Sequence, residues 1–413
     1  MVQALRNGSK RSVSLLCLGL AAAGNAAAEA SPYYVGGSVG FNHVSNVYRT
    51  QGSGSSDNVT QYSLLAGVDQ QIGREHLVVD GSLQSSRYAK NTGLNNNGYS
   101  LRGSLDWATA ERISGTFSTN MNRSLANYNS STNIQPVFER NIETDRQYQA
   151  VVRVGLVTRY SLEASYTHYN QDYSLIEYSS LVFHQNALSL GVVYKPSDLL
   201  RVGVALRHTT GEYPRYPDTV KYNPGSPLPV YIYVDDQFKR RDLDLTTDWQ
   251  LSGSTHLTTR LSWTNSTHDP VEALNYKGLT GAIGLGYNPG GRWRVNFQMT
   301  RDTGEQVATL GSSQNRVGTG YQVGGSYDIT SKIALTSTVA THNGNTSTNT
   351  AAGNNVPGRD SDHTVSLGLR YAYSRSVSAS CQAYRSGRSS TPTQANYNYD
   401  ANGFGCTAQL LLY

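Results

Sequence analysis

The sequence predicts an all-β protein: a transmembrane, antiparallel, up-and-down β-barrel of about 18 strands that follows a cleaved signal peptide. Three observations predict this fold. Apolar and polar side chains alternate with period 2 in segment after segment, short turns alternate with long polar loops, and no run of about 18 apolar residues follows residue 28. A soluble β-sandwich, solenoid or lectin would explain the alternation equally well, but it accounts less well for the regular exchange of turns and loops.

The hairpin from Asp242 to Trp263 shows the pattern most clearly. Leucine, threonine and tryptophan fall on one face of its first strand, whereas aspartate, threonine and glutamine fall on the other. A Ser-Gly-Ser turn at 252–254 reverses the chain, and the second strand alternates in the same way. A helix would scatter these side chains around its circumference, so the segment is interpreted as two antiparallel strands.

The N-terminal 28 residues have the pattern of a secretory signal peptide. Arg6, Lys10 and Arg11 form a basic region, an apolar region spans 13–23, and three alanines at 26–28 form a small-residue cleavage site. The apolar region is shorter than the roughly 18–20 residues that a spanning helix needs. We therefore expect two parts, a signal peptide over 1–28 and an outer-membrane barrel over 29–413.

Between the turns, each remaining element follows the same alternation. Turn-forming sequences such as Lys195-Pro196-Ser197-Asp198 and Asn288-Pro289-Gly290-Gly291 end the strands. The chain closes on Tyr413, an aromatic end that resembles the signal recognised by the barrel-assembly machinery. The expected strands run through 33–43, 62–68, 77–83, 99–107, 113–121, 148–156, 160–166, 188–194, 200–206, 242–251, 257–263, 279–287, 293–299, 321–327, 333–339, 367–373, 377–381 and 397–413.

Charged side chains lie on the strand face opposite the apolar one. In a barrel of this size that face borders an aqueous lumen, where charges stay hydrated and can tune the passage of polar solutes. Alternatively, they are ordinary wall residues without a dedicated site. The candidate lumen-facing residues are Asp242, Asp244, Asp248, Arg260, Arg294, Arg201, Arg207 and Arg370.

The segment from Tyr213 to Asp236 is the longest expected connection. Five prolines stiffen it, and tyrosines alternate there with charged residues. Aromatic rings with polar neighbours suit sugar rings, so this loop could contact a saccharide; it could also fold inward and narrow the pore, or be a plain surface loop. The candidate sugar-contact residues are Tyr213, Tyr216, Tyr222, Tyr231 and Tyr233.

Two cysteines remain in the expected mature chain. Cys381 and Cys406 lie on the last two expected strands, and both share a face with apolar neighbours. Antiparallel neighbours that face the same way can form a cross-strand disulfide in an oxidising compartment. The alternative is two free thiols that face lipid.

Composition and motifs exclude several function classes. The formal net charge is +5, but the basic residues are dispersed, so we expect no nucleic-acid partner. Histidines are scattered, without the spacing of a catalytic triad or a metal site. Glycines recur within strands and form no phosphate loop. We therefore expect no enzyme, no catalytic residue, no metal and no cofactor.

Several segments resemble outer-membrane β-barrels encoded with exopolysaccharide biosynthesis systems, the exosortase-B-associated polysaccharide transporter type within the β-barrel porin 2 family. These segments are spread over nearly the whole expected mature chain. They are GFNHVSNVYR at 40–49, RNIETDRQY at 140–148, LRHTTGEYPRY at 206–216, YKGLTGAIGLGY at 276–287 and SLGLRYAYSRSVSASCQAYR at 366–385. The first departs from the family pattern at His43-Val44, where an acidic residue is expected before Ser-Asn.

The resemblance implies a passive outer-membrane channel for exopolysaccharide export, with outer-membrane lipid around it and the polysaccharide as its cargo. It also implies a periplasmic export protein and an inner-membrane polymerase as partners. A general or substrate-specific uptake porin is the first alternative. A structural or adhesive surface barrel with a closed lumen is the second.

Overall fold

The computed structural model describes residues 31–52, 54–109, 112–128, 137–157, 159–222, 229–303, 317–349, 355–390 and 398–413. Within them, 18 strands form one antiparallel sheet. The strands are β1 (Tyr33–Val44), β2 (Asp57–Ile72), β3 (Glu75–Tyr88), β4 (Asn96–Ala108), β5 (Ile113–Leu125), β6 (Ile142–Val157), β7 (Tyr160–Tyr173), β8 (Phe183–Ser197), β9 (Leu200–Tyr222), β10 (Pro229–Ser252), β11 (Thr255–Asp269), β12 (Tyr276–Tyr287), β13 (Trp293–Asp302), β14 (Gly318–Asp328), β15 (Ile333–Asn349), β16 (Asn355–Ala372), β17 (Val377–Ser390) and β18 (Tyr399–Leu412).

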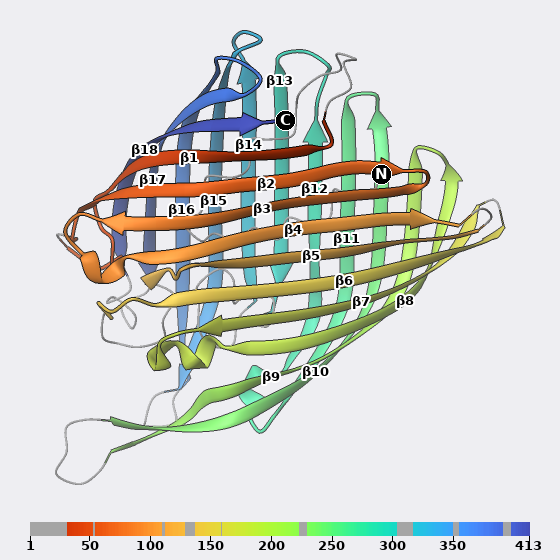
Figure 1. Ribbon diagram of the computed structural model, residues 1–413. Coiled ribbons are helices and arrows are strands. Elements are labelled where there is room, and N and C mark those ends of the chain that lie inside the picture. Colours follow the sequence, from red (N-terminus) through yellow and green to blue (C-terminus); the bar gives the residue numbers. More distant parts are fainter. Residues whose placement is uncertain are drawn as a thin grey trace.

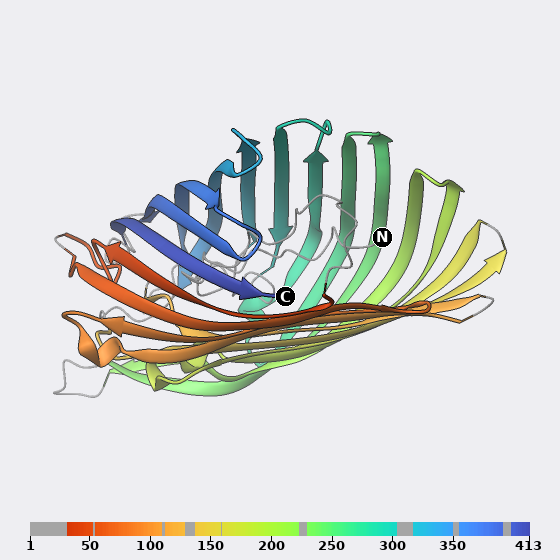
Figure 2. The same cartoon turned by 45° about the horizontal axis from the view of Figure 1, so that its top comes forward.

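The sheet closes on itself because β1 pairs with β18. The closing ladder runs from Val35 opposite Leu412 to Val44 opposite Gly403. Strands β2–β8 form one wall and β11–β16 the opposite wall, and the two walls run across one another in projection (Figures 1 and 2). Such crossing is expected of tilted strands in a closed barrel. The predicted fold class is confirmed, and each expected strand overlaps one observed strand in the same order.

Turns and loops alternate around the ring. Two-residue turns join β2 to β3 at Gly73-Arg74 and β10 to β11 at Gly253-Ser254. Gly73 has a φ of +62°, a conformation that glycine adopts without strain. The connections at the other end are longer, and three of them contain short 3-10 helices: η1 (Thr92–Leu94), η3 (Ile176–Leu181) and η4 (Glu272–Leu274). In the described part of the chain, no helix is long and apolar enough to cross a membrane.

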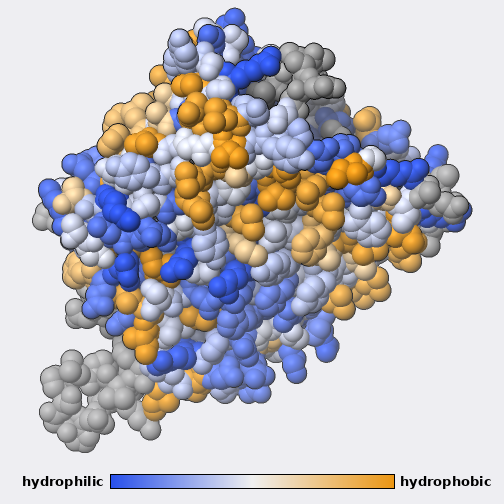
Figure 3. Space-filling model, viewed as in Figure 1, coloured by the Kyte–Doolittle hydropathy of each residue, from blue (hydrophilic) through white to orange (hydrophobic). Residues whose placement is uncertain are grey.

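Apolar side chains of the strands lie on the outside of the ring. Leu243 and Trp263 are 51% and 57% exposed, whereas Asp242 and Asp244 on the other face are 3% and 5% exposed. A soluble protein would show the reverse. Apolar side chains are accordingly visible on the outer surface (Figure 3). The outer face is therefore suited to lipid and the inner face to water.

The segment from Tyr213 to Asp236, expected to be a loop, is largely a two-stranded ribbon. Tyr213 pairs with Asp236 and Pro217 with Tyr233, and the ribbon contains two register shifts, at Val234/Asp236 and at Ile232/Tyr233. β8 pairs with β9 only as far as Glu212, and β11 pairs with β10 only as far as Gln237, so the ribbon extends beyond its neighbours (Figure 1). The prolines suggested a loop, but a ribbon with open edges leaves many N–H groups outside any ladder, and proline is tolerated there.

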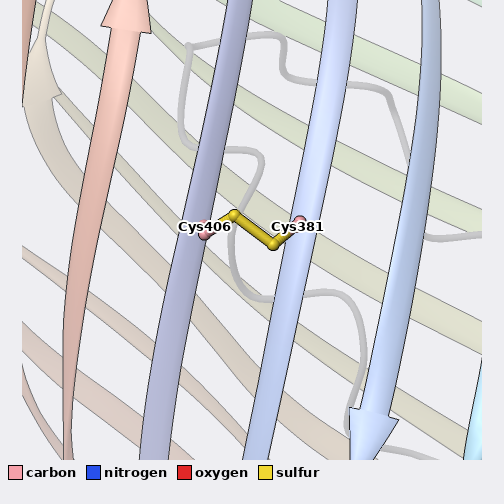
Figure 4. The surroundings of a disulfide bond; sticks show 2 residues. All are labelled: Cys381 and Cys406. Carbon is pink, nitrogen blue, oxygen red and sulfur yellow. A yellow bond between two sulfur atoms is a disulfide. The ribbon is translucent and has the colours of Figure 1, made fainter.

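Cys381 and Cys406 lie directly opposite each other on β17 and β18. Their Cα atoms are 4.0 Å apart, and a disulfide joins the two sulfur atoms (Figure 4). Phe404 on the same face is 56% exposed, so the bond lies on the outer surface of the barrel. It links two strands next to the β1–β18 closure.

Reducing the Cys381–Cys406 disulfide is expected to lower the free energy of unfolding by about 3 kcal/mol, because the cross-link restricts the unfolded chain between positions 25 residues apart. Urea unfolding of the vesicle-embedded protein, with and without reductant, measures this. The matched control is A379S/A408S, which changes a neighbouring cross-strand pair on the same face. An unchanged midpoint after reduction would contradict the expectation.

The expected signal peptide over 1–28 lies outside the described residues. The side chains of Tyr222 and Tyr231 also lie outside them.

Candidate lumenal site

The inner face of the barrel is lined by polar and charged side chains. Register places Asp242 opposite Arg207 on β9, and Thr246 opposite both Gly203 on β9 and Arg260 on β11. All of these residues alternate with exposed apolar neighbours, so they point into the lumen. The predicted lumen-facing positions on β9, β10 and β11 therefore share one surface.

Arg240 is at the centre of a buried network on this surface. Its side chain is 1% exposed. Its Nε donates to both oxygens of Asp242 at 3.0 Å, and its Nη1 donates to Asp302 at 2.8 Å and to Thr303 at 3.0 Å. Nη2 donates to the Thr264 and Thr280 hydroxyls at 3.4 and 3.3 Å. Every side of this guanidinium is thus bonded to protein.

Two further arginines join the same carboxylates. Arg207 contacts Asp244 at 3.0 Å and Asp242 at 3.2 Å, and Arg260 contacts Asp302 at 3.4 Å. The six residues Arg207, Arg240, Asp242, Asp244, Arg260 and Asp302, here called the β9–β13 network, balance three positive charges against three negative ones. Because its charges are paired and largely buried, the network stiffens the wall more than it offers free charge to a solute.

Other predicted wall residues lie outside this network. Arg294 makes a two-bond ion pair with Asp328, with both distances 2.8 Å. Asp248 contacts His256 at 2.9 Å, and Arg201 lies opposite Asp248 in the β9–β10 ladder. These pairs lie near the short-turn end, so they are separated from Arg240 along the strands. Arg370 lies on β16, several strands away from the network, between Ala334 and Ser380.

The inner face of β2–β7 is acidic. Register and alternation turn seven acidic side chains inward on these strands among the described residues, against Arg102 and Arg153. The acids are Asp57, Asp69, Asp80, Asp106, Glu143, Asp145 and Glu163. Asp69, Asp80 and Asp106 are exposed, as is Arg102, which lies opposite Asp80, and Arg153 is paired with Glu163 at 2.9 Å. This wall therefore carries accessible negative charge.

The two walls differ in accessibility. On β11, the inward side chains of Ser262, Thr264 and Ser266 are 0%, 0% and 1% exposed. Protein atoms therefore cover that wall, whereas Asp80 and Asp106 on the opposite wall remain exposed. A small hollow of about 100 Å³ lies between them on β7–β10, lined by small residues and bounded by Glu163 and Asp244. The accessible lumen thus lies against β2–β4.

The base of the β9–β10 ribbon is a buried aromatic cluster. Tyr213 packs with Phe183 and Phe238 at ring separations of 5.5 and 5.8 Å and is 8% exposed. Beside it, the Asp236 carboxylate lies 2.6 Å from Nδ1 of buried His268. Tyr213 therefore has no free ring face for a sugar, which differs from the prediction that this residue contacts one.

Further along the ribbon, an aromatic ring is accessible. Tyr233 is 40% exposed, and the Arg215 guanidinium lies 4.8 Å from its ring centroid. Tyr216 packs against the buried cluster. Of the three predicted sugar-contact tyrosines with a described side chain, Tyr233 is thus exposed, Tyr216 is half-buried and Tyr213 is buried.

The long-loop end is also held by aromatic side chains. The Tyr178 hydroxyl on η3 donates to the Tyr128 carbonyl oxygen at 2.9 Å, linking two different loops. Burial raises the pKa of both the Tyr128 and the Tyr178 phenols, so both stay neutral; the Tyr178 phenol donates, and the Tyr128 phenol accepts from the Asn141 N–H. These loops are therefore fixed to each other above the barrel wall.

A closed ring of strands with an apolar outside and a polar inside satisfies every backbone group within lipid. The chain is a bacterial outer-membrane β-barrel. No protein-family model matches it, and no curated protein sequence matches it. The resemblance to exopolysaccharide-export barrels therefore stays a prediction.

Solved structures of outer-membrane barrels resemble this barrel in architecture. The outer membrane protein OpdK from Pseudomonas aeruginosa is 12% identical, with a TM-score of 0.45 over 92% of this chain and 98% of that chain. OccK2 (OpdF) of the same organism, in complex with glucuronate, is 11% identical, with a TM-score of 0.46 over 92% of this chain and 98% of that chain. OccAB3 from Acinetobacter baumannii is 10% identical, with a TM-score of 0.45 over 92% of this chain and 98% of that chain. Likeness at this level carries no information about what this barrel transports.

Sequence reasoning missed Arg240 and Asp302, which hold the network together. Arg240 has the same parity as Asp242 and Asp244, so the alternation alone places it inward. Asp302 is the last residue of β13, and its contact with Arg240 spans 62 positions in sequence. Strand register, which brings the two together, is not readable from local pattern.

Proposed function

We propose that this barrel is a passive, non-enzymatic channel for small polar solutes, an uptake porin, with a preference for cations. The observation that carries the proposal is the exposed acidic surface of β2–β4 facing a balanced, covered wall on β9–β13. Hydrated charges on a pore wall favour oppositely charged solutes without a dedicated binding site. Purified protein in a planar lipid bilayer is expected to give stepwise ion conductance. Absence of conductance would instead favour a closed structural barrel.

Cation preference is expected to fall by roughly twofold or more in D80N/D106N, because two exposed carboxylates on the inner wall lose their charge. Reversal potentials under a salt gradient measure the ratio of cation to anion permeability. The matched control is D172N/D400N, which removes two carboxylates from the outward strand face. Equal permeability ratios for both double variants would contradict a role for the inner acids.

Exopolysaccharide export is a second candidate. It is supported by the accessible Tyr233 ring with Arg215 beside it on the protruding ribbon, a pairing that suits the apolar and hydroxyl faces of sugars. This function would require a periplasmic export protein as a partner. Deleting the gene and measuring surface-exposed against periplasm-trapped polysaccharide tests it. Undiminished surface polymer would remove this candidate.

A further inference from the structure

The outer wall carries a group of cations at the long-loop ends of β10, β12 and β13. Lys239, Arg241, Lys277 and Arg301 all point outward and are exposed. Lys277 and Arg301 are each one residue from the long-loop end of their strand, and Lys239 and Arg241 follow the point where the ribbon begins. Lys239, Arg241 and Lys277 are called the rim patch below, whereas Arg301 lies opposite Gly281, two rows nearer the membrane centre than Lys277.

Register fixes how the rim patch is arranged. Arg241 lies opposite Asn265, and Asn265 opposite Lys277, so the two cations share one row across three strands. Adjacent strands are about 4.8 Å apart, which places the two Cα atoms about 10 Å apart. His208 on β9 extends the row on the far side of Arg241. The row thus presents two cations, with Lys239 above it.

The next outward row, one step toward the membrane centre, is apolar. Leu243 pairs with Trp263, and Trp263 pairs with Leu279. They are 51%, 57% and 47% exposed. A row of cations therefore lies directly above a row of leucine and tryptophan, on the same strands. This order matches an amphiphile with anionic headgroups above several acyl chains.

The rim patch differs from outward cations that are paired with an acid on the wall. Arg146 is 3.8 Å from Asp172, and Arg385 is 2.6 Å from Asp400, so each is neutralised on the wall. Among the described residues, neither the three patch cations nor Arg301 forms an ion pair. Arg301 donates only to the Thr319 hydroxyl at 3.4 Å. The outward acids Glu212 on β9 and Asp269 on β11 both lie opposite Gln237, one row above Lys239.

We infer that the rim patch binds the phosphate groups of the multiply acylated, phosphorylated glycolipid of the outer leaflet, the lipopolysaccharide class. Its phosphates would contact Lys239, Arg241 and Lys277, and its acyl chains would lie along Leu243, Trp263 and Leu279. Charge complementarity supports this partner, because clusters of basic residues beside an apolar band attract anionic headgroups. The inference rests on the membrane location and is independent of what the channel transports.

The test is binding of purified lipopolysaccharide to the full-length protein in detergent. K239Q/R241Q/K277Q is expected to weaken binding by about a hundredfold, from the usual contribution of a basic residue near anionic headgroups. The charge-preserving variant K239R/R241K/K277R is expected to retain binding within about threefold. Lipopolysaccharide stripped of its phosphates is expected to bind the wild type as weakly as the intact lipid binds the triple glutamine variant.

The matched control is R87Q/R123Q/R146Q, which removes three outward cations from β3, β5 and β6 in another sector of the barrel. It is expected to bind as the wild type does. Equal weakening by both triple variants would overturn the inference, because general charge attraction would explain it. If the wild type bound phosphatidylglycerol vesicles as tightly as lipopolysaccharide, the assignment to the glycolipid would be overturned. All variants are compared after the heat-dependent gel shift confirms a folded barrel.

Discussion

Replacing Arg240 with methionine is expected to lower the free energy of unfolding by about 3–5 kcal/mol, the range for breaking a buried ion pair from one side. Asp242 and Asp302 would stay buried and lose their shared cation, while Arg207 and Arg260 would remain as partial partners. Urea unfolding in lipid vesicles, monitored by tryptophan fluorescence, measures the change.

The neighbouring residue provides the control. Arg241 is exposed on the outward face of the same strand, so R241M is expected to change the free energy of unfolding by less than about 0.5 kcal/mol. Adding D242N and D302N to R240M removes the orphaned charges and is expected to restore part of the stability. If R240M and R241M lost stability equally, burial of the network would not be the cause.

Removing β18, residues 399–413, is expected to abolish the folded barrel. β18 pairs along its length with both β17 and β1, so its loss leaves two open sheet edges. Each unpaired backbone group in hydrocarbon costs several kcal/mol, and the sum exceeds the stability of any domain. Loss of the heat-dependent gel shift and of protease resistance after refolding into vesicles would show it.

Removing Tyr413 alone tests closure of the barrel separately from recognition by the barrel-assembly machinery. Tyr413 lies beyond the end of β18, so its deletion leaves both ladders intact. Refolding into vesicles is expected to match the wild type. Assembly in cells is expected to fall, because the terminal aromatic resembles the signal for the barrel-assembly machinery. Normal assembly in cells would contradict that resemblance, and failed refolding would show that Tyr413 is needed for closure.

The strands were predictable because two solvents impose a simple rule on each of them. Leu243 and Trp263 must face lipid and Asp242 must face water, so local alternation reveals the strand and its two faces. Alternation also placed the charged candidates on the inner face. No contact between distant strands was needed for either inference.

The features that could not be predicted depend on contacts between residues that are far apart in the sequence. The Arg240–Asp302 pair joins β10 and β13, and only the registers of the three ladders between these strands bring the residues together. The ribbon from Tyr213 was predicted as a loop because proline content was read without knowing that both of its edges are open. Burial of Tyr213 likewise follows from Phe183 and Phe238, which come from other parts of the chain.

The covalent bond between Cys381 and Cys406 has a geometric consequence for the last hairpin. If β18 slipped by a single residue against β17, every leucine now in contact with lipid would turn toward water, and every glutamine would turn toward lipid. The bond forbids that slip for as long as it is intact. The final strand therefore keeps its register with β17 and meets β1 with the correct face already outward.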